Sequence, residues 1–176
     1  SINPDSKIIA VSHDVEKFDV RMGAFTLASV APYFPKGTVH LAVIDPGVGT
    51  DRRAIVVQTK EAFFVGPDNG LLMLAAKSHG IQHVFELANS AFRLPKVSRT
   101  FHGRDIFAPA AAYLDKGVKP EQFGSEVTDL VIPNFVCGIR KSSTLTGEVL
   151  NIDSFGNIVT NITEKELGKI RRAIVK

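Results

Sequence analysis

Hydrophobic and polar residues alternate along the chain in blocks, and these blocks predict strands and helices in turn. Short runs rich in β-branched and other apolar residues predict strands over residues 7–12, 39–44, 54–59, 62–65 and 84–87. Longer stretches with a broad apolar face predict helices over residues 20–31, 71–78 and 105–114. Strands that alternate with helices are typical of α/β folds, so we expect a layered α/β domain with a central sheet flanked by helices.

Residues with strong local preferences mark where several of these elements begin and end. Asp19 is a good N-cap for the first helix, and Asp105 can cap the third, which ends at Gly117. Residues 66–70 (GPDNG) carry the strongest turn signal in the chain. Residues 88–99 show little periodicity and are therefore expected to form a loop.

The character of the sequence changes over residues 132–146, which combine a proline, the only cysteine, a basic pair and a Ser-Ser-Thr run. We therefore expect a domain boundary in this region. It separates an N-terminal α/β domain, residues 1–135, from the start of a second domain, residues 145–176.

The residues beyond the boundary favour a small β structure. Residues 147–153 and 158–162 are predicted strands, joined by a turn at residues 154–157. Thr163 and Glu166 have the spacing of a capping box, which predicts a terminal helix.

One stretch, residues 39–53 (VHLAVIDPGVGTDRR), combines a predicted buried strand with residue types suited to chemistry. The strand ends at Asp45, and ligands of α/β sheets tend to bind beyond the carboxyl ends of strands. The glycines that follow let the backbone pass close to a bound group, and Arg52 could fold back toward Asp45. A simple Asp-Pro-Gly turn is the alternative interpretation, and the unusual segment 100–105 (TFHGRD) argues for the functional one.

Composition narrows the class of protein. The 176 residues, 44% hydrophobic and 22% charged, suit one domain or one domain plus part of another. The net charge of +3 is small and spread out, which argues against nucleic acid as a partner. No apolar run approaches the roughly 20 residues of a membrane helix, and no secretory signal opens the chain. Cys137 is alone, which fits a reducing, cytoplasmic setting, and the histidines lack metal-ligand spacing, so no metal is expected.

Four motifs then occur in one order along the chain. They are IDPGVGTDRR, GPDNGLL, SRTFHGRD with the following FAPAAA, and IDSFGNIVTNI. Together they closely resemble the S-adenosylmethionine hydroxide adenosyltransferases, the hydrolase relatives of the fluorinase and chlorinase enzymes. The resemblance runs over nearly the whole chain.

The resemblance implies an N-terminal α/β domain followed by a smaller β-barrel-like domain, which is truncated in this chain. It implies a homotrimer that binds S-adenosyl-L-methionine at interfaces between subunits and needs no cofactor. A water molecule displaces methionine from the ribose C5′ carbon and releases adenosine. The water-handling Asp-Arg-His triad of the family falls on Asp45, Arg52 and His102.

These residue types suit the reaction. The sulfonium of the substrate is already a good leaving group, so the main task is to hold one water in line at roughly 3–3.5 Å. A cationic Arg52 favours the hydroxide form of that water, and His102 can take a proton, since a histidine side chain ordinarily titrates at about pH 6.5. Asp45 can fix the imidazole or the ribose hydroxyls. The sequence leaves open which of the three is the base, and each residue alone could be structural.

Substrate contacts also carry over from the family. In the second domain, Asn157 offers an amide to the adenine edge, Phe155 a stacking face, and Asp153 a carboxylate to the amino-acid ammonium.

In the first domain, Phe18 stands where the halogenases have a tryptophan near the ligand. Thr100, Phe101 and Gly103 are expected to surround the reacting carbon, and Asp45 to contact the substrate.

The chain begins after the first strand and ribose-binding aspartate loop of the family, so we expect these 176 residues alone to be inactive and prone to associate. Two alternatives to a hydrolase remain: a halogenase that uses chloride or fluoride, and a ligand-binding relative without turnover. Halogenases carry tyrosine at the positions of Asp45 and His102. Fluorinases have an added loop at the place where this chain has only the short segment Thr59-Lys60-Glu61. Hydrolysis is therefore favoured.

Overall fold

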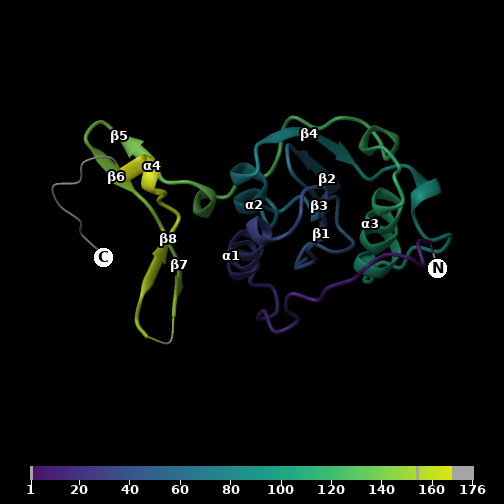
Figure 1. Cartoon of the computed structure of the whole chain (residues 1–176), viewed down its shortest axis with the longest axis horizontal. Coiled ribbons are helices and arrows are strands. Elements are labelled where there is room, and N and C mark those ends of the chain that lie inside the picture. Colours follow the sequence, from purple (N-terminus) through teal and green to yellow (C-terminus); the bar gives the residue numbers. More distant parts are fainter. Residues whose placement is uncertain (1, 154, 168–176) are drawn as a thin grey trace. The chain divides into compact units, whose positions relative to one another are not determined.

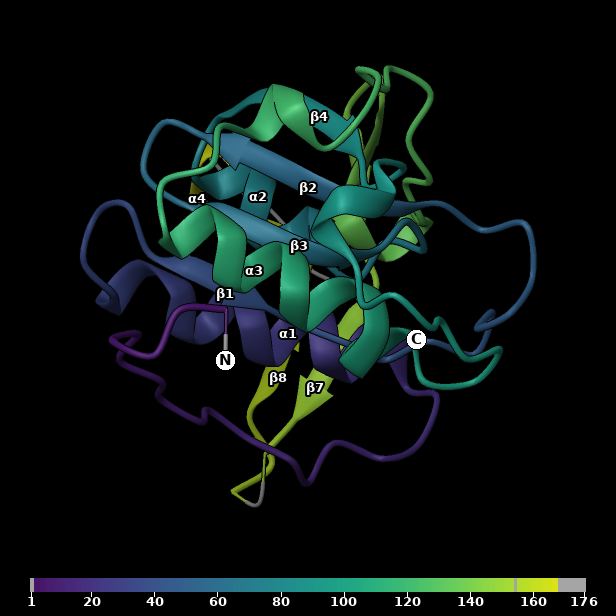
Figure 2. The same cartoon turned by 90° about the vertical axis from the view of Figure 1, so that its right-hand side faces the viewer.

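The computed structural model describes residues 2–153 and 155–167, and its chain divides into two compact units, Ser1–Ile132 and Pro133–Lys176. The first unit has a mixed α/β fold with a central sheet and helices, which confirms the predicted fold class. Figures 1 and 2 show α3 (Ala108–Asp115) on one face of the sheet and α1 (Val20–Val30) and α2 (Met73–Ser78) on the other.

The sheet has four strands in the order β1-β3-β2-β4, and β1 is parallel to β3 while the other neighbours are antiparallel. The strands are β1 (Val39–Leu41), β2 (Ala54–Thr59), β3 (Phe63–Pro67) and β4 (Ile81–Glu86). The predicted strands at 54–59, 62–65 and 84–87 are therefore confirmed. Val56, Val65 and Phe85 pack under η3 (Gly103–Phe107) and α3, where burial of apolar surface stabilises the fold.

The first of these strands differs from its prediction. The run at 39–44 was expected to be a buried strand, but β1 ends at Leu41 and lies at an edge of the sheet. His40 is buried whereas Leu41 is exposed, because alternate side chains of an edge strand face opposite sides. The backbone continues beside β3, since the Ala42 N–H donates to the Val65 carbonyl at 3.0 Å.

The helices begin where local chemistry allows. The longer ones are α1 (Val20–Val30), α2 (Met73–Ser78) and α3 (Ala108–Asp115). The Asp19 carboxylate accepts the Met22 N–H at 2.8 Å, so the predicted N-cap is confirmed. Short helical turns complete the unit at η1 (Ala31–Tyr33), η2 (Ser90–Phe92), η3 (Gly103–Phe107) and η4 (Pro120–Gln122).

Asp105 does not cap a helix, and that prediction was wrong. It lies inside η3, a π-helical turn that runs directly into α3, and its side chain is fully buried. The sequence pattern of an N-cap assumes that the chain enters the helix from an extended residue. Here the helical backbone already begins at His102, so the Asp105 carboxylate has other partners.

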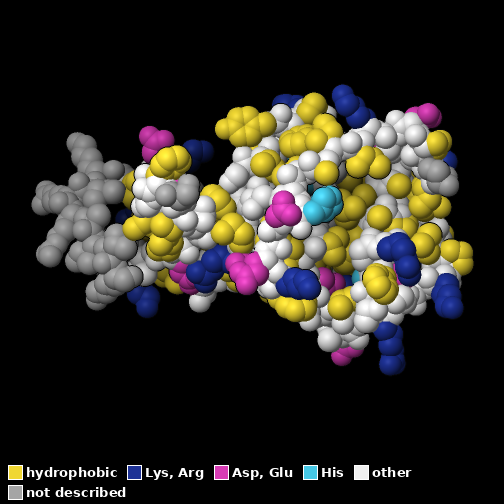
Figure 3. Space-filling model, turned by 90° about the horizontal axis from the view of Figure 1, so that it is seen from below, with side chains coloured by type: hydrophobic (Ala, Val, Ile, Leu, Met, Phe, Trp, Pro, Cys, Tyr) yellow, Lys and Arg dark blue, Asp and Glu magenta, His cyan; other side chains and the backbone are white. Residues whose placement is uncertain are grey.

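The predicted strand at residues 7–12 is also wrong. Residues 2–12 form neither helix nor strand, and Ile8 and Ile9 are exposed. An apolar run becomes a strand only beside a strand with open hydrogen-bonding groups, and this segment pairs with none in the described part of the chain. Its anchor is instead the Asp115 carboxylate, which accepts from Asn3 and Ser6. Figure 3, seen from the side along which the segment runs, shows hydrophobic side chains gathered on this face of the first unit.

The second unit consists of hairpins. Its elements are η5 (Asn134–Val136), β5 (Ile139–Lys141), β6 (Thr144–Thr146), β7 (Val149–Ile152), β8 (Ile158–Thr160) and α4 (Glu164–Leu167). β5 pairs with β6 and β7 with β8, each antiparallel, so both predicted strands form in shortened versions. The Glu166 carboxylate accepts from the Thr163 N–H at 2.7 Å, as a capping box requires. Ser154 of the predicted turn lies outside the described residues.

No helix among the described residues has both the length and the apolar character that crossing a membrane requires.

A buried histidine makes the first unit sensitive to acid. The His40 ring stacks on Phe64 with ring centroids 4.9 Å apart, and its Nε2 has no hydrogen-bond partner among the described residues. Burial, reinforced by His79, lowers the pKa of His40 from 6.5 to about 4. Between these values the unfolded chain binds a proton at His40 that the folded chain does not, so stability falls as the pH falls.

We therefore expect the free energy of unfolding to drop by up to about 3 kcal/mol between about pH 7 and about pH 4 because of His40 alone. His40→Phe should remove that contribution, and urea unfolding of both proteins across this range measures it. Equal pH dependence of the two proteins would contradict the assignment.

Candidate active site

The site begins where the chain leaves the sheet after β1. The Asn69 amide donates to the Ile44 carbonyl at 2.9 Å, and its oxygen accepts the Leu71 N–H at 3.1 Å. The strong turn at 66–70 therefore holds the backbone immediately before Asp45.

The loop that follows brings Arg52 back to Asp45, as the sequence suggested. Two hydrogen bonds close the loop. The Val48 N–H donates to the Asp45 carbonyl, and the Thr50 hydroxyl donates to the Gly47 carbonyl. Arg52 Nε donates to the two Asp45 carboxylate oxygens at 3.0 and 2.9 Å, and Nη2 donates to Oδ2. The side chains are only 11% and 6% exposed, so the pair is nearly desolvated, and the Nη1 donors take no part in it.

His102 completes the cluster from a segment 50 residues further along the chain. Arg52 Nη2 lies 2.7 Å from His102 Nδ1. A guanidinium can only donate, so Nδ1 is the acceptor and the ring proton of the neutral imidazole is on Nε2. Burial, and then the cation of Arg52, lower the pKa of His102, while Asp45 opposes them. His102 is therefore neutral at neutral pH and presents an N–H donor.

Two residues that the sequence did not single out contribute to this cluster. The Arg52 guanidinium lies over the Phe107 ring, 5.1 Å from its centroid, a cation–π arrangement. Phe107 is fully buried at the end of η3, the π-helical turn that follows His102. Such turns are frequent at functional sites, but their hydrogen bonds leave no clear signal in a sequence.

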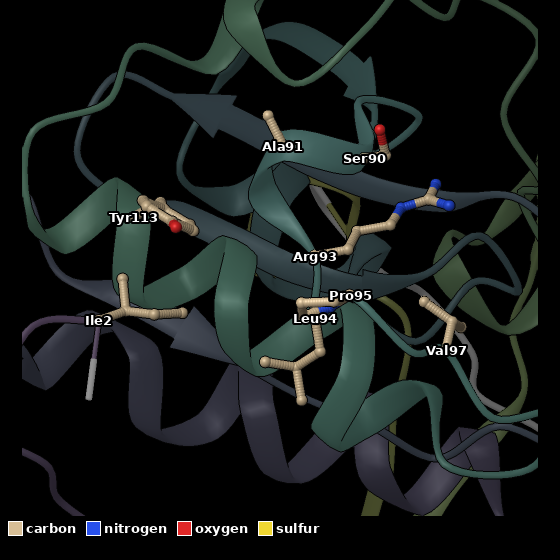
Figure 4. Close-up of a pocket in the computed structure, with 8 residues that line it drawn as sticks. All are labelled: Ile2, Ser90, Ala91, Arg93, Leu94, Pro95, Val97 and Tyr113. Atoms are coloured by element: carbon tan, nitrogen blue, oxygen red, sulfur yellow. The ribbon is translucent and has the colours of Figure 1, made fainter.

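The second is Arg93, whose cation also lowers the pKa of His102. Its Nη2 donates to the Leu87 carbonyl, and its Nε is buried without a partner in the described part of the chain. Arg93 borders a pocket of about 600 Å³, and Figure 4 shows its guanidinium pointing away from Tyr113 on the opposite wall. The lining residues are Ile2, Ser90, Ala91, Arg93, Leu94, Pro95, Val97 and Tyr113.

A smaller pocket of about 340 Å³ opens beside the triad. It is lined by Asp51, Arg52, Arg53, Asp68 and Val131. Asp68, predicted to serve turn chemistry, is buried and pairs with Arg53 at 2.8 Å. Within the described ranges, no group of three His, Cys, Asp or Glu side chains could hold a metal ion.

The loop of Asp45 and Arg52 meets the His102 segment at Gly49. Gly49 has φ of +78°, and a Cβ there would lie 2.6 Å from the Arg99 carbonyl oxygen. Only glycine allows both this backbone conformation and this approach.

An alanine in the left-handed backbone conformation costs roughly 1–2 kcal/mol. Gly49→Ala should destabilise the protein by more than this, because the loop must also move away from the Arg99 carbonyl. Gly37→Ala is the matched control, since Gly37 has φ of +84° and no atom within 4 Å of its Cβ position. Urea unfolding of the two variants measures the difference. Equal losses would show that the contact with Arg99 is unimportant.

Three other predicted residues lie beside His102 in the chain. The Thr100 N–H donates to Ser98 Oγ at 3.2 Å, and Gly103 starts η3. Phe101 is 59% exposed, with the Arg104 guanidinium 5.0 Å from its ring centroid. Their contacts with substrate stay predictions.

Phe18 stands apart from this group. It is exposed, makes no ring contact within the described residues, and has φ of +68° just before the N-cap Asp19. A bulky residue with positive φ is a genuine outlier, and such strain gathers at functional positions. Its place near the ligand stays a prediction.

The other predicted substrate residues lie in the second unit. The Asp153 carboxylate accepts the Phe155 N–H at 2.9 Å, the Asn157 N–H at 2.8 Å and the Asn157 amide at 2.7 Å. These bonds, that of the Asn157 side chain first, lower the pKa of Asp153. Asp153 and Asn157 therefore bind each other in the β7–β8 turn, whereas the Phe155 side chain is 90% exposed. Their roles toward a ligand remain predictions.

Comparison with known proteins gives one family. A family model described as the SAM hydroxide adenosyltransferase N-terminal domain matches residues 1–124. The (R)-S-adenosyl-L-methionine hydrolase of Salinispora tropica is 44% identical over 160 residues, which are 89% of this chain and 61% of that protein. A fluorinase of Actinoplanes sp. is 29% identical over 198 residues, covering 96% of this chain and 66% of the fluorinase.

A solved structure supports the same relationship. The crystal structure of an uncharacterized conserved protein from Thermotoga maritima matches with a TM-score of 0.82 and 41% identity, covering 94% of this chain and 64% of that one. The chain spans less than two thirds of the length of the Salinispora tropica hydrolase.

Proposed function

We propose a hydrolase function for this chain, which belongs to the SAM hydroxide adenosyltransferase family by its match over residues 1–124. The proposed reaction converts S-adenosyl-L-methionine and water into adenosine and L-methionine. The observation that carries it is the contact of Arg52 with both Asp45 and His102 in one nearly buried cluster. The name of the Salinispora tropica relative supports the same substrate.

In this proposal the triad presents a water molecule to the ribose C5′ carbon. The cation of Arg52 favours the hydroxide form of a water bound at its Nη1 side, and the proton of that water leaves to solvent. The C5′–O bond forms as the C5′–S bond breaks, and the bonding electrons go to sulfur to give the neutral thioether of methionine. Asp45 neutralises Arg52, so the site does not repel the cationic substrate.

His102 would act as a donor rather than as the base. Its Nδ1 lone pair is occupied by Arg52, so the neutral ring has no free acceptor for a proton of the water. Its Nε2–H can instead hold the nucleophilic oxygen. A hydroxide held between two donors keeps its third lone pair for the attack, as in-line displacement requires.

Two features support hydrolysis over halide transfer. Asp45 and His102 occupy the positions where the halogenase branch is expected to carry tyrosine. The β2–β3 hairpin is tight, with the Thr59 N–H donating to the Ala62 carbonyl at 3.0 Å, so it lacks the added loop expected of fluorinases.

Assembly as a homotrimer, with substrate bound at subunit interfaces, forms part of the proposal. It would give residues of the second unit, such as Asn157 and Phe155, a route to a ligand. Size-exclusion chromatography with light scattering tests the trimer.

The experiment on function uses a version of the chain extended to the length of the Salinispora tropica hydrolase, because the 176 residues alone are expected to be inactive. It is incubated with S-adenosyl-L-methionine, with and without chloride or fluoride, and the products are identified by mass. We expect adenosine and methionine in equal amounts and no halogenated adenosine. Asp45→Asn, which keeps the shape of the side chain but removes its charge, should form neither product at a comparable rate. Halogenated adenosine from the unchanged protein would favour the halogenase alternative.

A further inference from the structure

Asp105 is a fully buried carboxylate close to the triad but outside it. Its side chain is 0% exposed, although the Arg104 side chain that pairs with it is 63% exposed. Arg104 Nε donates to Oδ1 at 2.6 Å, and the Ser98 N–H donates to Oδ2 at 2.7 Å. These bonds, that of Arg104 first, lower the pKa of Asp105, so the carboxylate is charged. A buried charge is costly, and packing alone would be served by an apolar residue.

Two other partners of Asp105, Ser98 and Leu94, belong to the segment that leads into His102. The Asp105 carbonyl also accepts the Leu94 N–H at 2.9 Å, so one residue holds both ends of the stretch 94–98. Ser98 Oγ accepts the Thr100 N–H at 3.2 Å, which fixes the turn immediately before Phe101 and His102. Asp105 itself follows His102 by three residues within η3. His102 is therefore held from both sides, by η3 and by the Ser98 turn.

The same turn also supports the other half of the triad. The Arg99 carbonyl lies against Gly49, where even a Cβ would be 2.6 Å away. Gly49 is in the loop between Asp45 and Arg52. A shift of the Ser98 turn would therefore be transmitted to both segments, and the contact of Arg52 with His102 spans the two.

We propose that Asp105, acting through Ser98, is the positioning residue that sets the distance between His102 and Arg52. Its carboxylate locks the Ser98 turn onto η3, and this holds His102 Nδ1 at the Arg52 guanidinium and directs Nε2–H outward. The expected effect on turnover rests on the proposed hydrolase function. The expected effect on the His102 imidazole does not depend on that function.

The test uses Asp105→Asn, which is isosteric but loses the charge, and reads the tautomer of His102 by ¹⁵N NMR of the imidazole. In the unchanged protein we expect the Nε2–H tautomer, because Arg52 occupies Nδ1. In the variant we expect a mixture of tautomers. We also expect kcat to fall by about 10²-fold at nearly constant KM, because a displacement of about 1 Å in the reacting groups can cost that much rate.

Asp68→Asn is the matched control for the spectrum. Asp68 is likewise a buried carboxylate that binds an arginine and a backbone N–H, those of Arg53 and Val131. Loss of stability should be similar in the two variants, but the His102 tautomer should change only in Asp105→Asn. If both variants or neither alter the tautomer, the positioning role is wrong.

Ser98→Ala provides a second variant in case Asp105→Asn does not fold. It removes the acceptor for the Thr100 N–H and the 3.4 Å contact of Ser98 Oγ with Thr100 Oγ1. We expect a partial loss of the tautomer preference with a fall in kcat of about tenfold. An unchanged tautomer and rate would overturn the proposal. If the extended protein without substitutions fails to release adenosine, the proposed function is wrong, and the NMR measurement still decides the role of Asp105.

Discussion

Arg52→Ala should lower kcat by about 10³-fold or more, with a much smaller change in KM. The guanidinium is the only group that contacts both Asp45 and His102 among the described residues, and its charge is what favours hydroxide at the site. Both effects matter mainly in the transition state, so they appear in kcat rather than in substrate affinity. Steady-state kinetics of adenosine release, with binding measured separately by calorimetry, provide the comparison.

Arg52→Lys separates charge from geometry. Lysine keeps the cation but cannot donate to Asp45 and His102 through a rigid fork, so we expect most of the loss to persist. In Arg52→Ala the Asp45 carboxylate, which is only 6% exposed beside Arg52, loses its paired cation, and this should cost about 3 kcal/mol or more of stability. A folded Arg52→Ala protein with unchanged kcat would refute the role of this residue.

His102→Ala should lower kcat by about 10²-fold, the second largest effect expected of a single substitution. Two further variants test which nitrogen matters. Glutamine can offer an N–H near the position of Nε2, whereas asparagine can offer an acceptor near Nδ1 but no donor further out. If His102 works as a donor to the nucleophile, His102→Gln should recover part of the rate and His102→Asn should not. Recovery by asparagine alone would reverse the assignment.

The pH dependence follows from the direction of the pKa shift. Burial and Arg52 lower the pKa of His102, so the neutral imidazole persists below its usual range. The rate should therefore be level through neutral pH and fall only below about pH 6.5, where protonation of Nδ1 would break the contact with Arg52.

The parts of this structure that the sequence predicts are those with local causes. Asp19 caps α1 because an aspartate before an amphipathic stretch needs only the next turn to act. Asp45 and Arg52 lie seven residues apart across a glycine-containing loop, so their contact could be anticipated. The β2–β3 hairpin follows from two apolar runs separated by a short polar turn.

The parts that the sequence does not predict depend on distant partners. The apolar run at 7–12 has strand propensity but no partner strand in the described part of the chain, so it remains exposed. Aspartate is a common N-cap residue, but Asp105 is buried inside a π-helical turn. The hydrogen bonds of such a turn cannot be predicted from the local sequence. The approach of Gly49 to Arg99 joins segments 50 residues apart, and only the fold brings them together.

The most direct test of the central claim is the reaction of S-adenosyl-L-methionine in ¹⁸O-labelled water, with the label located by mass spectrometry of adenosine and its fragments. Direct attack of a water held by Arg52 and His102 predicts one ¹⁸O atom per adenosine, at the C5′ oxygen, and none in methionine. Adenosine without the label, or no adenosine at all from the extended protein, would contradict direct displacement by water.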